Sequence, residues 1–175
     1  ISSDLNLDLD LHWYDILFSD SFATLDNWSS IFGDWNIEQG HLLSQSSLTY
    51  DGFHPLGPHR LNLSTPFHIL DEGSQDISIK LLMKHELEWD NDTLFVDLYN
   101  SSDSINVLRL MDQNWSYHNQ YINTTLSGNL DYHISIGISP DITLGYRGIE
   151  LDQIDVFYEL MDGCKKGDYN HDGDI

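Results

Sequence analysis

The sequence predicts an all-β fold, an antiparallel sandwich or barrel, and three observations support this prediction. Apolar and polar residues alternate with a period of two in several segments, which is typical of strands buried on one face. Clusters of Asp, Asn, Ser, Gly and Pro separate these segments at intervals of roughly 8–14 residues. No long window shows the apolar stripe of an amphipathic helix. With 175 residues, 40% of them hydrophobic, the chain can build one substantial core.

Four segments in the middle and at the end of the chain give the clearest strands, and each has one apolar face. These faces are Ile77, Ile79, Leu81 and Met83 in 76–84; Leu94, Val96 and Leu98 in 93–99; Ile134, Ile136 and Ile138 in 132–138; and Ile154, Val156 and Tyr158 in 153–160. Residues 52–66 hold three of the four prolines, so we expect an ordered loop over the sandwich there.

The N-terminal extension, residues 1–13, has the strictest alternation in the chain. Its apolar positions include Leu5, Leu7, Leu9 and Leu11, with polar residues between them. An exposed row of this kind is a liability for a protein in water, so we expect it to be buried. It is either an edge strand of the same sandwich or a strand donated to a neighbouring subunit, which would give self-assembly into a filament.

Charge excludes two classes of partner. The chain has 7 Lys and Arg against 29 Asp and Glu, a formal net charge of −22. Nucleic acids and anionic membrane surfaces bind basic faces, so neither is expected as a partner. The apolar runs are too short to span a bilayer, so membrane insertion is not expected either.

Glycosylation signals point to an extracellular protein. Asn-x-Ser/Thr sites occur at Asn27, Asn62, Asn91, Asn100, Asn114 and Asn123. Six sites are more than the about two that chance predicts for this composition, although a polar surface with an accidental surplus is the alternative. The chain opens on Ile1 rather than Met, as expected if a leader has been removed. With Cys164 as the only cysteine, no internal disulfide can form.

Residues 14–160 resemble concanavalin A-like jelly-roll domains of the MAM and laminin-G kind, which are common in secreted proteins. The opening is similar in FSDSF (18–22), LDNW (25–28) and GDWNIEQGHL (33–42), and later parts in LSTPF (63–67), DNDTLFV (90–96) and GIELDQIDV (148–156). The resemblance implies a jelly-roll β-sandwich that binds, adheres or assembles. It also implies a calcium ion shared between the first and last strands, at Asp20 and Asp152.

The C-terminal segment, 161–175, ends in a second candidate calcium site. GDYNHDGDI (167–175) matches the first part of an EF-hand loop and resembles the opening of a dockerin repeat. Asp168, Asn170 and Asp172 would supply side-chain oxygens and Asp174 its backbone carbonyl. The bidentate acid that closes such a loop would come from a continuation of the chain or from another chain.

Two further sets of residues bear on catalysis and on sugar binding. Glu86, Glu88 and Asp90 alternate on one face, but in a different order from the acids of laminarinase-type glycoside hydrolases, and a solvated strand end explains them. Trp115, Tyr117 and Tyr121 have the parity to share one side of a strand. Such rings either stack on sugars or pack into the core.

These observations predict a non-catalytic, calcium-binding, extracellular module that acts in cell-surface adhesion or self-assembly. Its partner would then be another copy of the chain or another surface protein. The alternative is a carbohydrate-binding module of a dockerin-bearing, glycan-degrading protein, with a polysaccharide as its partner.

Overall fold

The computed structural model describes residues 16–32, 35–44, 59–70, 73–88, 92–139 and 148–158, and every regular element in these ranges is a strand. The strands are β1 (Ile16–Asp20), β2 (Trp28–Phe32), β3 (Trp35–Glu38), β4 (His41–Ser44), β5 (His59–Leu63), β6 (Phe67–Ile69), β7 (Ser74–Glu86), β8 (Thr93–Tyr99), β9 (Ser104–Leu110), β10 (Gln113–Ser127), β11 (Leu130–Ser139) and β12 (Gly148–Tyr158). The all-β prediction is confirmed.

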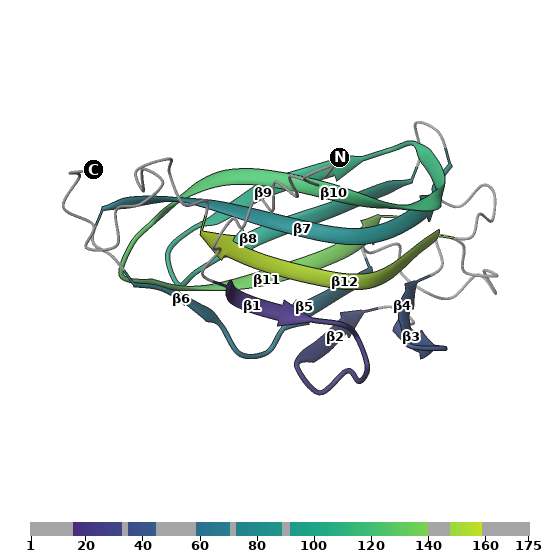
Figure 1. Cartoon of the computed structure of the whole chain (residues 1–175), viewed down its shortest axis with the longest axis horizontal. Helices are drawn as coiled ribbons and strands as arrows, with labels where there is room; N and C mark the ends of the chain where they lie inside the picture. Colours follow the sequence, from purple (N-terminus) through teal and green to yellow (C-terminus); the bar gives the residue numbers. More distant parts are fainter. Residues whose placement is uncertain are drawn as a thin grey trace, which may run out of the picture.

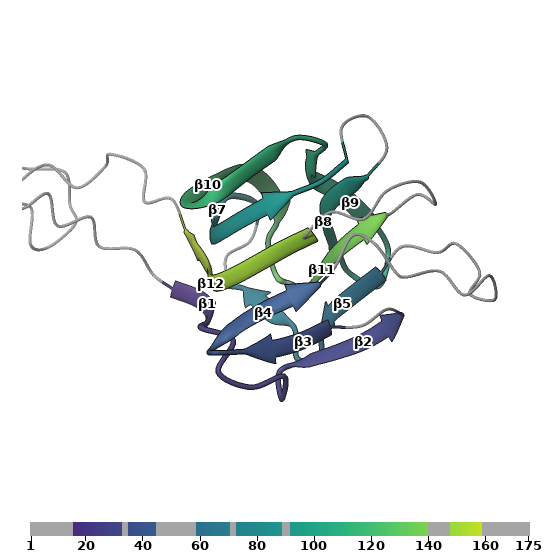
Figure 2. The same cartoon turned by 90° about the vertical axis from the view of Figure 1, so that its right-hand side faces the viewer.

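The strands form two antiparallel sheets that face each other (Figures 1 and 2). Sheet A has the order β10-β7-β12-β4-β3, and β1 also pairs with β12. Sheet B has the order β2-β5-β11-β8-β9, and β6 pairs with one end of β11. Neighbours in each sheet are mostly distant in the sequence, which is the crossed connectivity of a jelly-roll sandwich.

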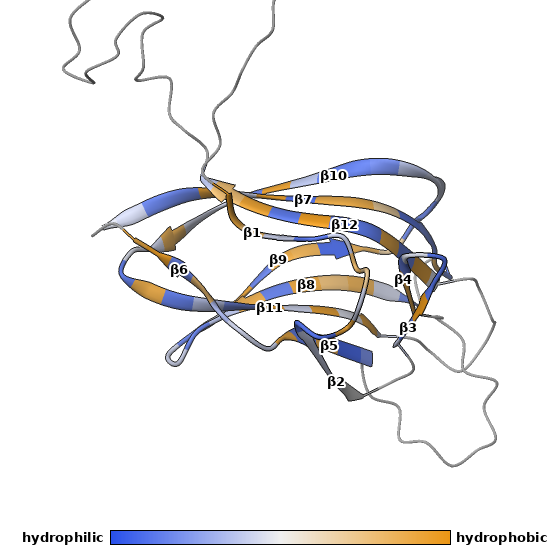
Figure 3. Ribbon diagram, turned by 60° about the horizontal axis from the view of Figure 1, so that its bottom comes forward, coloured by the Kyte–Doolittle hydropathy of each residue, from blue (hydrophilic) through white to orange (hydrophobic). Residues whose placement is uncertain are grey.

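The core lies between the inner faces of the two sheets. The apolar faces predicted for 76–84, 93–99 and 132–138 are all fully buried, and so are Ile154 and Val156 of β12, whereas Tyr158 is half-buried. Several strands therefore show alternating apolar and polar residues along their length, as β12 does in Figure 3. Because successive side chains point to opposite faces, burying one set leaves the other set on the outside of the sandwich.

The expectation of a loop over residues 52–66 is wrong for its second half. Residues 59–63 form β5, which pairs with β2 on one side and β11 on the other. His59, Leu61 and Leu63 are buried, whereas Arg60 and Asn62 are half-buried on the opposite face. The prolines predict turns at the flanks of this segment. The alternation of buried and half-buried residues in 59–63, however, is typical of a strand.

Several predictions fall outside the described residues and stay predictions. They concern the extension 1–13 with Leu5, Leu7, Leu9 and Leu11, the glycosylation site Asn91, and the calcium loop with Asp168, Asn170, Asp172 and Asp174. Within the described ranges, no helix has the length and apolar character needed to cross a bilayer.

Candidate functional site

A row of polar side chains crosses the outer face of sheet B. The registers pair Asn62 of β5 with Ser135 of β11. They also pair Ser135 with Asp97 of β8, which lies opposite Asn106 of β9. The chain neighbours of these residues point into the core, so the polar side chains point away from it. The sheet thus gathers hydrogen-bonding groups from four strands that are far apart in the sequence.

Arg60 is the anchor of this row. Its Nη1 atom donates to Asp97 Oδ2 at 3.0 Å and to Ser135 Oγ at 3.2 Å. Asn106 Nδ2 donates to the other Asp97 oxygen, Oδ1, at 2.7 Å. The guanidinium carbon of Arg60 also lies 4.5 Å from the centre of the Phe95 ring, a cation–π contact. With an ion pair on one side and an aromatic face on the other, the arginine is held in one orientation.

Gly137 makes the contact between Arg60 and Phe95 possible. The registers place Gly137 of β11 between Arg60 of β5 and Phe95 of β8. A Cβ atom on Gly137 would lie 2.0 Å from Cζ of Phe95 and 2.8 Å from the backbone oxygen of His59. The Phe95 ring therefore lies across the bare glycine backbone, and only 8% of the residue stays exposed. Glycine is needed here for the close approach of a ring.

Tyr99, at the end of β8, adds an aromatic ring to the site. It stacks on His133 of β11 with ring centres 5.1 Å apart and planes 14° apart. His133 is itself fixed, because its Nδ1 lies 2.9 Å from the backbone oxygen of Leu63 and must carry a proton to bond it. Burial raises the pKa of Tyr99, against a smaller lowering effect of the charge on Arg60. The phenol therefore keeps its proton and can both donate and accept a hydrogen bond.

The turn between β8 and β9 closes one end of the site. Asn100 Oδ1 accepts hydrogen bonds from the backbone nitrogens of Ser102 and Asp103, at 2.8 and 2.9 Å. Asp103 Oδ1 accepts from the backbone nitrogen of Ser104 at 2.8 Å. Side chains that bond their own backbone in this way stiffen short turns. The turn, with the sequence Asn-Ser-Ser-Asp, is thus a rigid border of the site.

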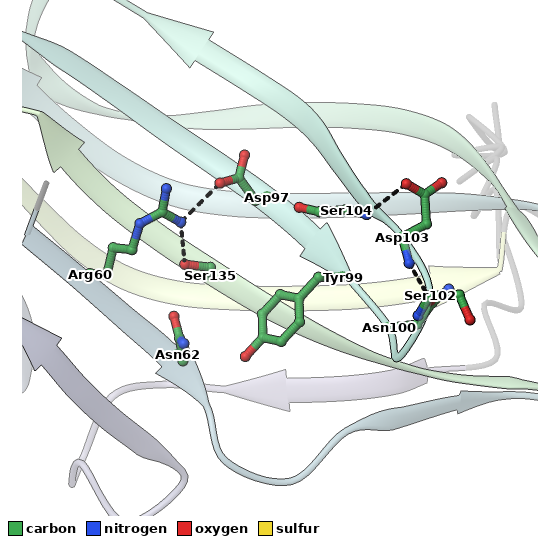
Figure 4. Close-up of a pocket in the computed structure, with 9 residues that line it drawn as sticks. All are labelled: Arg60, Asn62, Asp97, Tyr99, Asn100, Ser102, Asp103, Ser104 and Ser135. Atoms are coloured by element: carbon green, nitrogen blue, oxygen red, sulfur yellow. Dashed lines mark hydrogen bonds and ion pairs between the residues drawn. The ribbon is translucent and has the colours of Figure 1, made fainter.

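Together these residues line a hollow of about 670 Å³ on the outer face of sheet B (Figure 4). The lining residues are Arg60, Asn62, Asp97, Tyr99, Asn100, Ser102, Asp103, Ser104 and Ser135. The volume lies within the range of small-molecule sites, about 300–1,000 Å³. The Oδ1 atom of Asn62 is buried without a hydrogen-bond partner among the described residues, and a buried acceptor of this kind gains from any donor that reaches it. The hollow therefore combines one fixed ring with many hydroxyl, amide and carboxylate groups.

The predicted aromatic set lies elsewhere, on β10 at the edge of sheet A. Tyr117 and Tyr121 are exposed, and Trp115 is half-buried. Lys84 of β7 lies over both Trp115 and Tyr117, 4.7 and 4.8 Å from the two ring centres. The prediction that the three residues share one strand agrees with the structure, and the core-packing alternative does not hold for the two tyrosines.

Asp20 and Asp152, the predicted calcium ligands of the sandwich, take different partners. The two oxygens of Asp20 accept from the backbone nitrogen of Phe22 (2.7 Å), Nδ2 of Asn27 (3.0 Å) and Nε1 of Trp28 (2.9 Å). Asp152 Oδ1 pairs with Nδ1 of His41 at 2.8 Å. Among the described residues no group of three or more His, Cys, Asp or Glu is arranged to hold a metal. The calcium site stays a prediction, and Asp20 has a structural role in the turn that holds Phe22 at φ 52°.

Most of the predicted glycosylation sites have side chains that take part in local hydrogen bonds. Asn27 donates to Asp20, Asn114 accepts from the backbone of Ser116, and Asn123 accepts from Ser78. Asn62 and Asn100 line the hollow itself. Sugar attached to either of these two would occupy the hollow, so modification there and binding of a free ligand exclude each other.

Sequence reasoning missed the site on sheet B, although part of the signal was present. The face opposite Leu94, Val96 and Leu98 in β8 carries Asp97 and Tyr99, which the same alternation would have placed outside. Arg60 is the first Lys or Arg of an acidic chain. What the sequence does not contain is the pairing of β5 with β11, because registers between distant strands depend on the whole sandwich.

Comparison with solved structures finds β-sandwich domains, several of them carbohydrate-binding modules. One match comes from work on human gut microbiota that express endo-acting O-glycanases to initiate mucin breakdown; it has a TM-score of 0.52 and 8% identity and covers 82% of this chain and 99% of that chain. Another is the CBM22-1–GH10 pair of Clostridium thermocellum xylanase 10B complexed with xylohexaose, with a TM-score of 0.49, 12% identity and coverage of 86% and 30%. A third is a carbohydrate-binding module of Cellvibrio mixtus lichenase 5A in complex with cellotriose, with a TM-score of 0.43, 10% identity and coverage of 82% and 98%.

The strand order of the two sheets makes the fold a jelly-roll β-sandwich, and the match with a TM-score of 0.52 agrees with this fold. No protein-family model matches the chain, and the search of curated proteins found no match. The chain spans only 30% of the xylanase chain, which comprises CBM22-1 and GH10 modules. What each of these proteins binds is a property of that protein, because sandwiches of one fold carry different sites.

Proposed function

We propose that this chain is a carbohydrate-binding module that holds an oligosaccharide in the hollow on the outer face of sheet B. The observation that carries the proposal is the anchored Tyr99 ring beside a cluster of fixed polar groups. Sugar rings have an apolar face that stacks on aromatic side chains and hydroxyl groups that both donate and accept hydrogen bonds. Arg60 and Tyr99 offer donors, and Asp97, Asp103 and Asn62 offer acceptors. The solved neighbours support the fold, and the proposal itself rests on the hollow.

The charges of the hollow favour a neutral glycan. Among the described residues that line it, the one cation, Arg60, is already paired with Asp97, and Asp103 adds a second carboxylate. An acidic sugar would have to approach these carboxylates on a chain with a net charge of −22. Neutral hexose or pentose units meet no such penalty.

We also propose that the module is extracellular and that it belongs to a dockerin-bearing protein. The six glycosylation signals and the C-terminal calcium loop are the features of an extracellular module joined to a larger, dockerin-bearing protein. Assembly through the N-terminal strand is the competing proposal, and it depends on residues 1–13. We favour sugar binding over assembly because the hollow is a binding site among the described residues, and assembly through residues 1–13 would leave it without a role.

A blocking substitution tests the proposal without weakening the core. Ser104 is exposed at the rim of the hollow, so we expect Ser104→Trp to fill it while the fold stays intact. Ser21→Trp, at an exposed position between β1 and β2, is the matched control. Binding is measured by calorimetry with xylohexaose and cellotriose, and with trigalacturonate as the acidic probe.

The expected result is binding of a neutral probe that falls more than about tenfold in Ser104→Trp and in Tyr99→Ala, and stays unchanged in Ser21→Trp. Trigalacturonate should not bind. Equal affinity in the blocked variant and the control would place the sugar somewhere else and overturn the proposal. Thermal unfolding of each variant shows whether a loss of binding comes from a loss of fold.

A further inference from the structure

The outer face of sheet A carries two exposed tyrosines on one edge strand. Tyr117 is 42% exposed and Tyr121 57% exposed, both on β10. The residues between and beyond them on the same face, Asn119, Asn123 and Thr125, are exposed and polar. At the rise of a strand, four residues span roughly 10–13 Å, so the two rings form a line rather than a single contact point.

The position of the Tyr117 ring is fixed by a network of side chains. Its hydroxyl donates to Oε1 of Glu150 on β12 and lies 3.1 Å from Nδ1 of His41 on β4. Lys84 lies over the ring, 4.8 Å from its centre, and its Nζ atom pairs with Glu150 Oε2 at 2.9 Å. A ring held by three neighbours loses little freedom when a ligand stacks on it, which lowers the cost of binding.

The polar groups around the rings suit a sugar more than a protein surface. Asp152, whose side chain is 36% exposed, and His41 stand beside Tyr117 and can exchange hydrogen bonds with hydroxyl groups. The cores of protein interfaces are apolar and poor in charges, whereas here asparagines and ion pairs separate the rings. Single aromatic rings between hydrogen-bonding groups match the alternation of ring faces and hydroxyls along a glycan chain.

Charge again selects a neutral ligand. The two lysines of β7 are both paired, Lys84 with Glu150 at 2.9 Å and Lys80 with Asp155 at 3.6 Å. An anionic polysaccharide would need cations that are not already engaged, and it would meet the negative field of the whole chain.

We propose that the outer face of sheet A is a second glycan-binding surface, on which an extended neutral polysaccharide lies along β10 across Tyr117 and Tyr121. The two sheets turn their outer faces in opposite directions (Figure 2), so a chain with both sites bridges two polysaccharide strands. This bridging rests on the proposed function of the hollow, whereas the surface on sheet A does not. Two weak sites on one chain bind a surface far more tightly than either does alone.

The test compares variants of each face on immobilised neutral polysaccharides: cellulose, xylan, mannan and β-1,3-glucan. Tyr121→Ala alters sheet A, Ser104→Trp blocks the hollow, and Ser21→Ala, between β1 and β2, is the control outside both proposed sites. All three positions are exposed, so each variant should fold as the parent does. Sedimentation of each variant follows self-association.

We expect Tyr121→Ala to lower retention on at least one polysaccharide more than about tenfold, with Ser21→Ala unchanged. Combining Tyr121→Ala with Ser104→Trp should abolish retention and the cross-linking of polysaccharide particles. If Ser104→Trp has no effect while Tyr121→Ala does, the proposed function of the hollow fails and the surface on sheet A stands. If Tyr121→Ala equals the parent on every polysaccharide, or changes only self-association, this inference is overturned.

Discussion

The outer faces of the two sheets arise from the same alternation of side chains, yet they differ in shape and in the way their aromatic rings are held. On sheet B the rings of Phe95 and Tyr99 lie down on the sheet, on Gly137 and on His133, and a stiff turn walls the space beside them. On sheet A, Tyr117 and Tyr121 are exposed on an edge strand, and among the described residues no turn borders them as the β8–β9 turn borders the hollow. The first arrangement makes a hollow and the second a line of rings.

This difference shows that small residues and turns, more than the strands themselves, determine the shape of an outer face and therefore the shape of ligand that fits it. A strand supplies the parity that puts a side chain outside. Gly137 lets the Phe95 ring approach closely and support Arg60, which lines the hollow, and Asn100 holds the turn between β8 and β9 that closes one end of it. Sheet A has long strands and paired lysines instead, so its surface suits an extended ligand.

The largest expected effect comes from Gly137→Ala. The new Cβ would lie 2.0 Å from the Phe95 ring and 2.8 Å from a backbone oxygen, so both must move. Overpacking of this kind costs about 1–3 kcal/mol of unfolding free energy, measured by urea denaturation. We also expect weaker binding in the hollow, because Arg60 loses its aromatic support. Ser139→Ala, exposed on the same strand, should change the stability by less than about 0.5 kcal/mol; an equal loss in both variants would refute the close-approach argument.

A smaller effect is expected from comparing one ion pair on each face. A double-mutant cycle with Arg60→Met and Asp97→Asn should give a coupling energy of about 1 kcal/mol, because the paired atoms are 3.0 Å apart, within hydrogen-bond distance. The matched cycle on sheet A uses Lys80→Met and Asp155→Asn. Its atoms lie 3.6 Å apart, so we expect at most about 0.5 kcal/mol. A larger coupling on sheet A would show that the hollow is not the more rigid face.

The smallest effect concerns acid stability on sheet A. Burial acts to raise the pKa of Glu150, but hydrogen bonds from Tyr117 and Lys84 outweigh it and leave the pKa below the usual 4.5. A carboxylate with a lowered folded-state pKa stabilises the fold above its unfolded-state pKa, and this contribution is lost as the pH falls through the folded-state value. The difference in unfolding free energy between the parent and Glu150→Gln should therefore become smaller below about pH 4.5. Urea unfolding between pH 3 and 7 measures it.

Glu38→Gln, at an exposed position on β3, is the control for this experiment. Its unfolding free energy should differ from that of the parent by the same amount at every pH in this range. If the difference in unfolding free energy between the parent and Glu150→Gln grows on acidification, Tyr117 and Lys84 do not stabilise the charged form of Glu150.

Part of the fold was predictable because burial acts on local pattern. The strands at 76–84, 93–99 and 132–138 were predicted with their buried faces, since a period of two leaves little choice once one face is apolar. The strand at 59–63 was missed because it is short and flanked by prolines. The line of tyrosines on β10 was predicted from parity, whereas the hollow was not predicted at all.

The sequence by itself determined that the chain is all-β, that it carries a net charge of −22, and which faces of the long strands are inside. These properties follow from composition and from neighbours in the chain. Only the tertiary structure decided that Arg60 meets Asp97 and Ser135, that Phe95 lies over Gly137, and that Tyr99 stacks on His133. Each of these contacts depends on the register between strands distant in the sequence. That register is set by packing of the whole core, because a shift of one residue would turn every buried side chain of a strand to the outside.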